Sequence, residues 1–379
     1  MLIERTIRRH IEDKIFKGKI IIVYGARQVG KTTLIKDIEA RYDKQNPLYL
    51  SCDEPDMREL LTTKTSTELK DTIGKHELVF IDEAQRVPDI GLTLKLIADN
   101  FPHIQVIATG SSSFELSSSV VEPLTGRKYE FYLFPLSVQE LSSIYSPLET
   151  NRLIENRLIM GMYPEVITDP NESKDLIKEL AESYLYKDIL TYQGIRSPEA
   201  LERLVQALAL QIGSEVSYNE LAGTAGIDKK TVDTYIQILE KAFVIFRLNP
   251  FSRNLRNELK KLRKIYFFDT GIRNAVIRNL NPIHLRQDAG QLWENFLISE
   301  RMKYNLNNRI DVNAYFWRNH QQQEIDYLED NSGLLSGFEM KWGTKRHRIP
   351  KVFLSTYKGS TIEKIDRTNF MQFVCPQGI

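Results

Sequence analysis

A short segment near the N-terminus constrains the fold of this chain more than any other feature. Residues 25–32 read Gly-Ala-Arg-Gln-Val-Gly-Lys-Thr, which matches the pattern G-x-x-x-x-G-K-T. The apolar run 20–24 enters this segment as an expected strand, and residues 33–40 leave it as an expected helix. Strand, glycine-rich loop and helix in this order predict a phosphate-binding loop, because the loop N–H groups and the helix N-terminus together hold a phosphate.

The residue types in this loop suit a nucleoside triphosphate. Gly25 and Gly30 let the backbone approach the phosphates, where a Cβ would clash or require a positive φ. Lys31 brings a positive charge to the β- and γ-phosphates, and Thr32 brings a hydroxyl to Mg²⁺. Arg27 either helps with the phosphates or only covers the site. The alternative interpretation of the whole segment is a glycine turn followed by a solvated lysine. The residues expected to contact ATP are Gly25, Ala26, Arg27, Gln28, Val29, Gly30, Lys31, Thr32, Thr33 and, from a later strand, Thr109.

The composition is that of a globular protein. Its overall charge is too small to attract the whole molecule to nucleic acid or to a membrane. The 379 residues are enough for two or three domains, with 42% hydrophobic and 27% charged residues and a net charge of +1. Any contact with DNA must therefore be a local patch. We expect neither a membrane span nor a signal peptide. Two distant cysteines, Cys52 and Cys375, favour a cytoplasmic location over a disulfide framework.

The first 145 residues alternate between expected helices and strands. Isoleucines spaced four residues apart predict an amphipathic helix over residues 2–16. Further buried strands are expected at 47–52, 78–82 and 105–109, with helical segments around 56–74 and 90–100. This alternation predicts an α/β fold with helices on both faces of the sheet.

The expected strand 78–82 ends in a carboxylate pair, Asp82 and Glu83. Asp82 would hold Mg²⁺ directly or through water, and Glu83 would polarise the attacking water as general base. On its own, such a pair is an ordinary solvated strand end. About 50 residues after a phosphate-binding loop, it predicts the second half of an ATPase site.

Polar residues also follow the next expected strand. Thr109 or Ser111 could touch the γ-phosphate or the lytic water, because the carboxyl ends of parallel strands converge on a ligand. A simple Gly-Ser turn is the alternative. Arg127 follows a glycine turn and could neutralise charge in the transition state, in cis or on a neighbour's nucleotide. Surface arginines are common, so an ordinary exposed side chain is the alternative there.

Four motifs together carry a resemblance to a known family. They are Gly-Ala-Arg-Gln-Val-Gly-Lys-Thr-Thr, Phe-Ile-Asp-Glu-Ala-Gln-Arg-Val-Pro, Ile-Ala-Thr-Gly-Ser-Ser-Ser-Phe and Leu-Thr-Gly-Arg. The chain resembles the AAA-type ATPases of prokaryotes that carry a C-terminal domain of unknown function. The resemblance implies an AAA-like core over residues 1–145, with Asp82 as metal holder, Glu83 as base and Arg127 as arginine finger or sensor. It also implies a small helical lid over 146–198.

Residues 199–264 carry the pattern of a winged helix. Three helices are expected at 202–212, 218–222 and 228–241, followed by a strand at 243–248. The third helix would present its polar N-terminal half to DNA, through Lys229, Lys230, Thr231 and Thr234. A structural or protein-docking module is the alternative, because acidic residues are interspersed. A basic stretch at 253–264 either extends the patch or is a solvated loop.

Residues 265–379 contain the residue types of a PD-(D/E)xK nuclease. Glu294 lies on an expected helix, Asp326 on one strand, and Glu339 with Lys341 on the next. The three carboxylates would bind Mg²⁺, and Lys341 would activate water from the same strand face as Glu339. An ordinary half-exposed strand explains the pattern equally well. The domain of the resembled family looks like this nuclease fold, and the basic run 345–348 could contact a phosphate backbone.

We therefore expect an AAA-type P-loop core, a helical lid, a winged helix and an α/β restriction-endonuclease-like domain. The expected function is an ATP-binding and ATP-hydrolysing motor or switch, DNA-associated, with a metal-dependent nuclease-like domain. The alternative is a signalling or scaffold ATPase whose C-terminal domains bind proteins and cleave nothing. An arginine acting in trans would also require a homo-oligomer.

Overall fold

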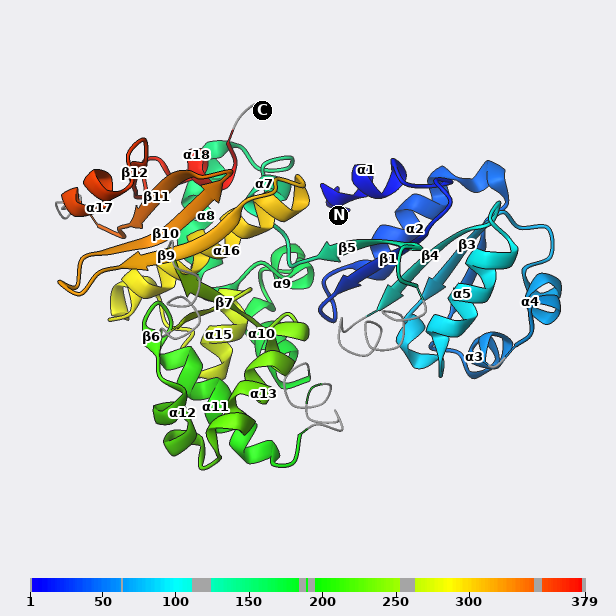
Figure 1. Ribbon diagram of the computed structural model, residues 1–379, viewed down its shortest axis with the longest axis horizontal. Helices are drawn as coiled ribbons and strands as arrows, with labels where there is room; N and C mark the ends of the chain where they lie inside the picture. The colour runs from blue at the N-terminus through cyan, green and yellow to red at the C-terminus, as the bar shows by residue number, and fades with distance from the viewer. Residues whose placement is uncertain are drawn as a thin grey trace. The chain divides into compact units, whose positions relative to one another are not determined.

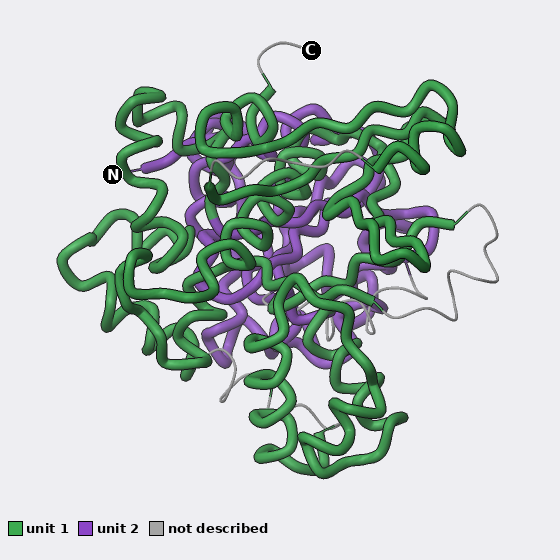
Figure 2. The backbone as a smooth tube through the Cα atoms, turned by 90° about the vertical axis from the view of Figure 1, so that its left-hand side faces the viewer, with its two compact units in different colours: residues 1, 136–240, 244–379 green, residues 2–135, 241–243 purple. Residues whose placement is uncertain are grey.

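The computed structural model divides into two compact units. It describes residues 2–62, 64–110, 124–183, 189, 195–252, 263–343 and 350–376. The N-terminal unit comprises residues 2–135 with 241–243, and the C-terminal unit comprises 136–240 and 244–379 (Figure 2). Each unit is described by itself below.

The described part of the N-terminal unit contains a five-stranded, fully parallel sheet (Figure 1). Its order is β2-β3-β4-β1-β5, with β1 Ile20–Gly25, β2 Leu48–Ser51, β3 Leu78–Asp82, β4 Gln105–Gly110 and β5 Lys128–Leu133. All six residues of β1 are buried, so both faces of the sheet are covered at this strand. The predicted α/β core is confirmed. Strand β5 was not predicted, and only Phe131 and Leu133 of its six residues are buried.

The helices of this unit lie between the strands in the chain, as the alternation predicted. They are α1 Ile7–Glu12, α2 Lys31–Arg41, α3 Pro55–Leu61, α4 Ser66–Ile73 and α5 Ile90–Asn100, with 3-10 turns η1 Asp43–Gln45 and η2 Ala84–Arg86. The helix expected over 2–16 is shorter than predicted. Its four isoleucines are nevertheless all buried, including Ile3 and Ile15 outside the helix.

The C-terminal unit begins with helices and alternates later in the chain. Its helices are α7 Val138–Leu141, α8 Pro147–Met160, α9 Pro164–Thr168, α10 Ser173–Ala181, α11 Pro198–Leu210, α12 Tyr218–Ala225, α13 Lys229–Lys241, α15 Thr270–Val276, α16 Ala289–Asn307, α17 Lys351–Thr356 and α18 Phe370–Val374, with 3-10 turn η4 Ile283–Leu285. Gly226 ends α12 in the left-handed region, with φ 71°.

A second sheet joins the parts of this unit that were predicted as separate domains. Among the described residues its order is β12-β11-β10-β9-β7-β8-β6. The strands are β6 Glu215–Val216, β7 Ile245–Pro250, β8 Arg263–Phe267, β9 Asn313–Arg318, β10 Glu324–Asn331, β11 Leu334–Met340 and β12 Thr361–Ile365. β7 pairs in parallel with β9, and the boundary predicted at 264/265 falls inside β8. The predicted winged-helix strands and the later strands therefore share one sheet.

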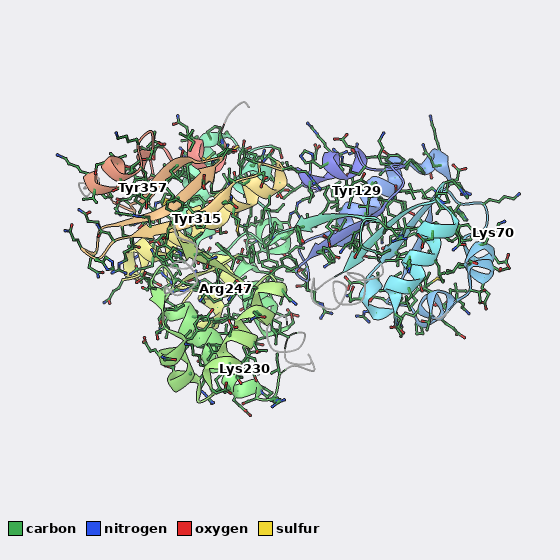
Figure 3. All side chains as sticks on the ribbon, in the orientation of Figure 1. Lys70, Tyr129, Lys230, Arg247, Tyr315 and Tyr357 are labelled. Atoms are coloured by element: carbon green, nitrogen blue, oxygen red, sulfur yellow. The ribbon has the colours of Figure 1, made fainter. Side chains whose placement is uncertain are left out.

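One face of that sheet is closed by an aromatic and aliphatic cluster. Its members are Phe251, Trp317, Ile325, Leu328, Leu335 and Phe353, with Tyr315 and Tyr357 packed against it (Figure 3). Phe353 is fully buried and lies on α17, so this helix covers the cluster. Both cysteines are free thiols, and burial raises the pKa of Cys52 to about 12. Within the described ranges, none of the helices has the length and apolar character needed to span a bilayer.

Candidate functional site

The predicted phosphate-binding loop connects β1 to α2, as its sequence requires. Gly30 precedes the helix with φ 96°, a conformation that other residues rarely adopt, and Lys31 is the first helical residue. A Cβ on Gly25 would lie 2.3 Å from the carbonyl oxygen of Leu133, so the end of β5 leaves room there only for glycine. The loop is thus shaped by backbone contacts before any ligand is considered.

The side chain of Lys31 is buried inside this loop. Its Nζ donates to the carbonyl oxygens of Ala26 at 2.9 Å and Gly25 at 3.2 Å. The same ammonium lies 3.9 Å from Oε1 of Glu83. Arg27 and Gln28 are exposed at the loop's turn, and Thr33 is exposed on α2. The loop lysine and the predicted base therefore share one site.

Hydroxyl groups surround the carboxylate of Asp82 at the end of β3. Thr32 Oγ1 donates to Oδ2 at 2.7 Å, Tyr49 Oη donates to the same oxygen at 2.8 Å, and Thr109 Oγ1 donates to Oδ1 at 2.5 Å. Burial, together with the Asp82 carboxylate, raises the pKa of Tyr49. The site thus gathers the predicted Thr32, Asp82 and Thr109, and adds Tyr49.

Sequence reasoning missed Tyr49, although a signal was present. Tyr49 pairs with Phe80 and Ser51 pairs with Asp82 in the parallel register of β2 and β3. Because strand side chains alternate, Tyr49 and Asp82 fall on one face of the sheet. Correct pairing of the two strands would have predicted this contact.

The donor set at Asp82 fits the Mg²⁺ that an ATPase of this class requires. Mg²⁺ prefers oxygen ligands, and the hydroxyl of Thr32 lies within hydrogen-bond distance of a carboxylate that is 4% exposed. The three side chains that donate to Asp82 are neutral hydroxyls.

Glu83 is held in an unusual backbone conformation beside Asp82. Its φ of 53° lies in the left-handed region, which a non-glycine residue adopts at an energetic cost. The Glu83 N–H donates to Thr109 Oγ1 at 3.0 Å, and Gln85 Nε2 donates to Glu83 Oε2 at 2.5 Å. Gln85, which the sequence did not single out, therefore orients the predicted base.

Arg127 is not brought to the loop within this unit. Its carbonyl accepts from Ile20 N at 2.9 Å, at the start of β1, whereas the loop follows the end of that strand. The two ends of a six-residue strand are separated by roughly 20 Å. The Arg127 side chain instead pairs with Asp99 at 2.6 Å. Ser111 lies outside the described residues.

The residues predicted as a nuclease site gather in the C-terminal unit. Lys341 Nζ lies 3.2 Å from Glu339 Oε2 and 3.5 Å from Asp326 Oδ2. Asp326 Oδ2 also accepts from the Met340 N–H at 2.8 Å. Burial raises the pKa of Glu339 to about 7. The charge of Lys341 works to lower this pKa, and the charge of Asp326 works to raise it. One half of this cluster is therefore an internal ion pair.

The other half contains a lysine that the sequence did not predict there. Lys264 on β8 is 1% exposed, and its Nζ lies 3.2 Å from Glu294 Oε1 and in close contact with Glu324. Tyr266 Oη donates to the same Glu294 oxygen at 2.7 Å. We call these residues, with Asp326, Glu339 and Lys341, the acidic cluster. The sequence did not indicate that Lys264 belongs to this cluster, because Lys264 was predicted only as part of the basic stretch 253–264.

Opposing charges control protonation within the acidic cluster. Burial raises the pKa of Glu294 to about 7, while Lys264 works to lower it and Asp326 to raise it. Burial works to lower the pKa of Lys264, but Glu294, Glu324 and Asp326 outweigh burial and raise it. Lys264 is therefore held as a cation among these carboxylates.

The predicted DNA-contacting residues lie at the start of α13. Lys229 and Lys230 are exposed there, and Lys230 is labelled in Figure 3. Thr231 Oγ1 donates to Asp228 Oδ2 at 2.6 Å, and Thr234 Oγ1 donates to the Lys230 carbonyl at 3.0 Å. Both hydroxyls therefore form hydrogen bonds to groups in or next to the first turn of α13. The basic positions 253–262 and 345–348 lie outside the described residues.

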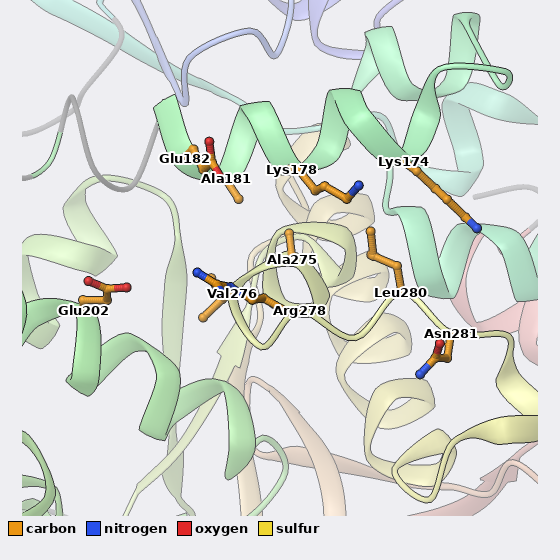
Figure 4. A pocket seen from close by; sticks show the side chains of 10 residues that line it. All are labelled: Lys174, Lys178, Ala181, Glu182, Glu202, Ala275, Val276, Arg278, Leu280 and Asn281. Carbon is orange, nitrogen blue, oxygen red and sulfur yellow. The ribbon is translucent and has the colours of Figure 1, made fainter.

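A cleft of about 460 Å³ also lies in the C-terminal unit (Figure 4). Side chains of α10 and of residues 275–281 line it, together with Glu202 of α11. Its charged residues are Lys174, Lys178, Glu182, Glu202 and Arg278, which mix both signs. None of the residues that line it belongs to a predicted site.

Three stretches of the chain match described families. Residues 17–142 match an AAA domain, residues 151–282 match a domain of unknown function (DUF8612), and residues 289–369 match a domain of unknown function (DUF4143). These matches support a family of AAA-type ATPases with a C-terminal domain of unknown function. The parallel sheet and the AAA match together fit a P-loop ATPase core.

Two relatives match most of the chain. An uncharacterized protein of Mycobacterium tuberculosis is 27% identical over 354 residues, covering 90% of this chain and 74% of its own. An uncharacterized protein of Methanocaldococcus jannaschii is 25% identical over 344 residues, covering 86% and 75%. Among solved structures, the Pif1 helicase of Candida albicans has 16% identity and a TM-score of 0.27, covering 52% of this chain and 50% of its own. That score is too low to support an argument about fold or function.

Proposed function

We propose that this chain binds and hydrolyses ATP, and that its N-terminal unit works as a nucleotide-dependent switch of the AAA type. The contact between Thr32 and Asp82, at 2.7 Å, is the observation that carries the proposal. It joins the first turn after the phosphate-binding loop to the acidic end of β3. ATPases with this loop use that pairing of hydroxyl and carboxylate to hold Mg²⁺.

The residues of the loop have distinct roles in this proposal. Loop N–H groups and the start of α2 bind the phosphates, and Lys31 exchanges the carbonyls of Gly25 and Ala26 for phosphate oxygens. When bound, Mg²⁺ would add positive charge at the β- and γ-phosphates, and Thr32 with Asp82 would hold it. Lys31 thus has ready partners both with and without nucleotide.

Glu83 accepts the proton of the attacking water in this proposal. Thr109 holds its N–H and Gln85 its carboxylate, so the base is oriented from two sides. The Lys31 ammonium lies 3.9 Å from the same carboxylate. Arg127 would serve only a neighbouring copy's nucleotide, because its place at the start of β5 does not bring it to its own loop.

Two variants with matched controls test the ATPase proposal. Lys31→Ala should abolish ATP hydrolysis, measured as phosphate release, whereas Lys70→Ala, at an exposed position, should retain it (Figure 3). Glu83→Gln should bind a fluorescent ATP analogue and turn over poorly, whereas exposed Glu77→Gln should hydrolyse normally. Hydrolysis by Glu83→Gln at the wild-type rate would show that Glu83 is not the base.

DNA association with metal-dependent cleavage is the function that the sequence predicted for the C-terminal unit. The gathering of Glu294, Asp326, Glu339 and Lys341 into one cluster supports it. The donor chemistry opposes it, because Lys264 and Lys341 already supply cations to these carboxylates. Across the ranges that the structure describes, no three His, Cys, Asp or Glu side chains are arranged to hold a metal ion. The residues present do not fit the metal, and we derive no cleavage step.

The same observation favours a C-terminal unit that cleaves nothing. Lys264 occupies the interior of the acidic cluster with a built-in positive charge. Linear and circular DNA incubated with ATP and Mg²⁺ or Mn²⁺ should therefore stay intact. Cleavage that is lost in Lys341→Ala and kept in the exposed variant Lys358→Ala would instead establish the nuclease. Salt-sensitive DNA binding that weakens in Lys230→Ala would support α13 as the DNA-contacting helix.

A further inference from the structure

A buried arginine from the start of the chain contacts the phosphate-binding loop. Arg5 precedes α1 and is 8% exposed. Its Nη1 donates to the carbonyl of Val29 at 2.6 Å, and its Nη2 donates to the carbonyl of Phe134 at 2.5 Å. One guanidinium therefore joins the loop to the residue that follows β5.

The bond to Val29 determines how the next peptide group is oriented. The carbonyl of Val29 and the N–H of Gly30 belong to one trans peptide, so they point in opposite directions. With the carbonyl held by Arg5, the Gly30 N–H is directed away from that hydrogen bond. Gly30 itself has φ 96°, a conformation that suits glycine. Loop N–H groups are what bind phosphate, so Arg5 orders one of the donors in advance.

The bond to Phe134 lies where the end of β5 meets the loop. Gly25 pairs with Leu133 in the parallel register of β1 and β5, one residue before Phe134. A Cβ on Gly25 would meet the Leu133 carbonyl at 2.3 Å. The loop and the end of β5 are therefore in direct backbone contact, and Arg5 binds both of them from one side.

The main chain just beyond Phe134 is also held firmly, within the C-terminal unit. The N–H of Leu136 donates to the Met162 carbonyl at 2.8 Å, and its carbonyl accepts from Lys303 Nζ at 3.2 Å. Two residues further along the chain, the Val138 N–H donates to the carboxylate of Glu300 on α16 at 2.6 Å. Pro135 is thus the single residue between two anchored stretches of backbone, one ending at the Arg5 bond and one beginning at Leu136.

We propose that Arg5 is a positioning residue of the ATPase site, which presets the phosphate-binding loop and passes a change in that loop to the backbone at Phe134–Leu136. The inference rests on the proposed ATPase function. It requires only that nucleotide alters the loop, since Arg5 donates to the loop and to Phe134 at once. The expected consequence is that Arg5 carries a change caused by nucleotide from the loop to the backbone around Pro135.

Nucleotide binding by full-length variants tests the first part. Arg5→Lys keeps the charge but replaces the two separate Nη donors of the guanidinium with a single ammonium, so the Kd for Mg·ADP should rise about tenfold. Arg5→Ala should show a rise at least as large. Arg9→Ala removes the same charge from an exposed position of the same segment and should bind as the wild type does. In hydrolysis assays the KM for ATP should rise more than kcat falls.

Hydrogen–deuterium exchange with and without saturating Mg·ADP tests the second part. In the wild type, bound nucleotide should change the exchange rates of backbone amides both in the loop, residues 25–32, and at residues 136–140. In Arg5→Lys the loop should still respond while residues 136–140 no longer do. A purely structural role for Arg5 would lower stability and leave both responses in place.

The outcomes separate this inference from the ATPase proposal. Wild-type protein that binds no nucleotide would overturn the ATPase proposal, and the Arg5 inference with it. Normal binding and hydrolysis in the wild type, combined with unchanged Kd or an unchanged response at 136–140 in Arg5→Lys, would overturn the Arg5 inference alone. If Arg5→Ala does not fold, Arg5→Lys and Arg9→Ala still decide the question.

Discussion

Two carboxylate sites in this chain differ in what surrounds them. Asp82 in the N-terminal unit is bonded by hydroxyls of Thr32, Tyr49 and Thr109. The acidic cluster in the C-terminal unit contains two lysines, and Lys264 is almost fully buried within it. Hydroxyls leave the negative charge of a carboxylate uncompensated, so that it remains available to a metal ion. Lysines compensate it from within the chain, so carboxylate residues alone do not identify a metal site.

The largest expected effect contrasts one aspartate from each site. Asp82→Asn removes the charge that holds Mg²⁺, so kcat for ATP should fall about 100-fold. Asp326→Asn, the matched change in the acidic cluster, should alter hydrolysis less than about twofold. Both rates are measured by phosphate release at saturating ATP. Equal losses in the two variants would contradict the contrast between the sites.

The next effect concerns the built-in cation of the acidic cluster. Lys264→Met should lower the free energy of unfolding by about 3 kcal/mol or more, because it leaves buried carboxylates without their partner. Lys341→Met, at a side chain 33% exposed, should cost less. Urea denaturation of each variant measures this difference. A stable Lys264→Met that binds Mn²⁺ more tightly than the wild type would show that the lysine ammonium occupies the position of a metal ion.

A pH dependence should follow from the raised pKa values of Glu294 and Glu339. Burial is the main cause in both, and each pKa is raised from 4.5 to about 7. Between these values the folded state holds protons that the unfolded state has released, so the free energy of unfolding should fall as pH rises from about 5 to about 8. Glu294→Gln should flatten this slope, and exposed Glu77→Gln should not. Denaturation midpoints at several pH values measure the slopes, and identical slopes would contradict the prediction.

The smallest effect should come from Tyr49. Tyr49→Phe removes one of three hydroxyls on Asp82, so stability should fall by about 1 kcal/mol and kcat by less than about tenfold. Thermal unfolding and phosphate release report the two quantities. A complete loss of hydrolysis would mean that Tyr49 contacts the nucleotide or the attacking water, beyond orienting Asp82.

Local sequence was informative wherever a site is built from neighbours in the chain. The strand, loop and helix around residues 25–32 are contiguous, so the motif alone predicted them and the structure has them in place. Asp82 was also predictable, because carboxyl ends of parallel strands meet at one edge. Arg127 shows the limit of such reasoning. Strand β5 was not predicted, so nothing in the sequence placed Arg127 at the opposite edge of the sheet from the loop.

Contacts between distant segments required the tertiary structure. Arg5 meets a carbonyl 129 residues away, and Lys264 meets Glu294 from a strand that the prediction assigned across a domain boundary. Both depend on which strands are neighbours and in which register, and residue types do not encode that. The phosphate-binding loop, the α/β core and the candidate carboxylates could all be predicted from the sequence. Which carboxylates face hydroxyls and which face lysines depends on tertiary packing, because a side chain's partners are set by the elements folded against it.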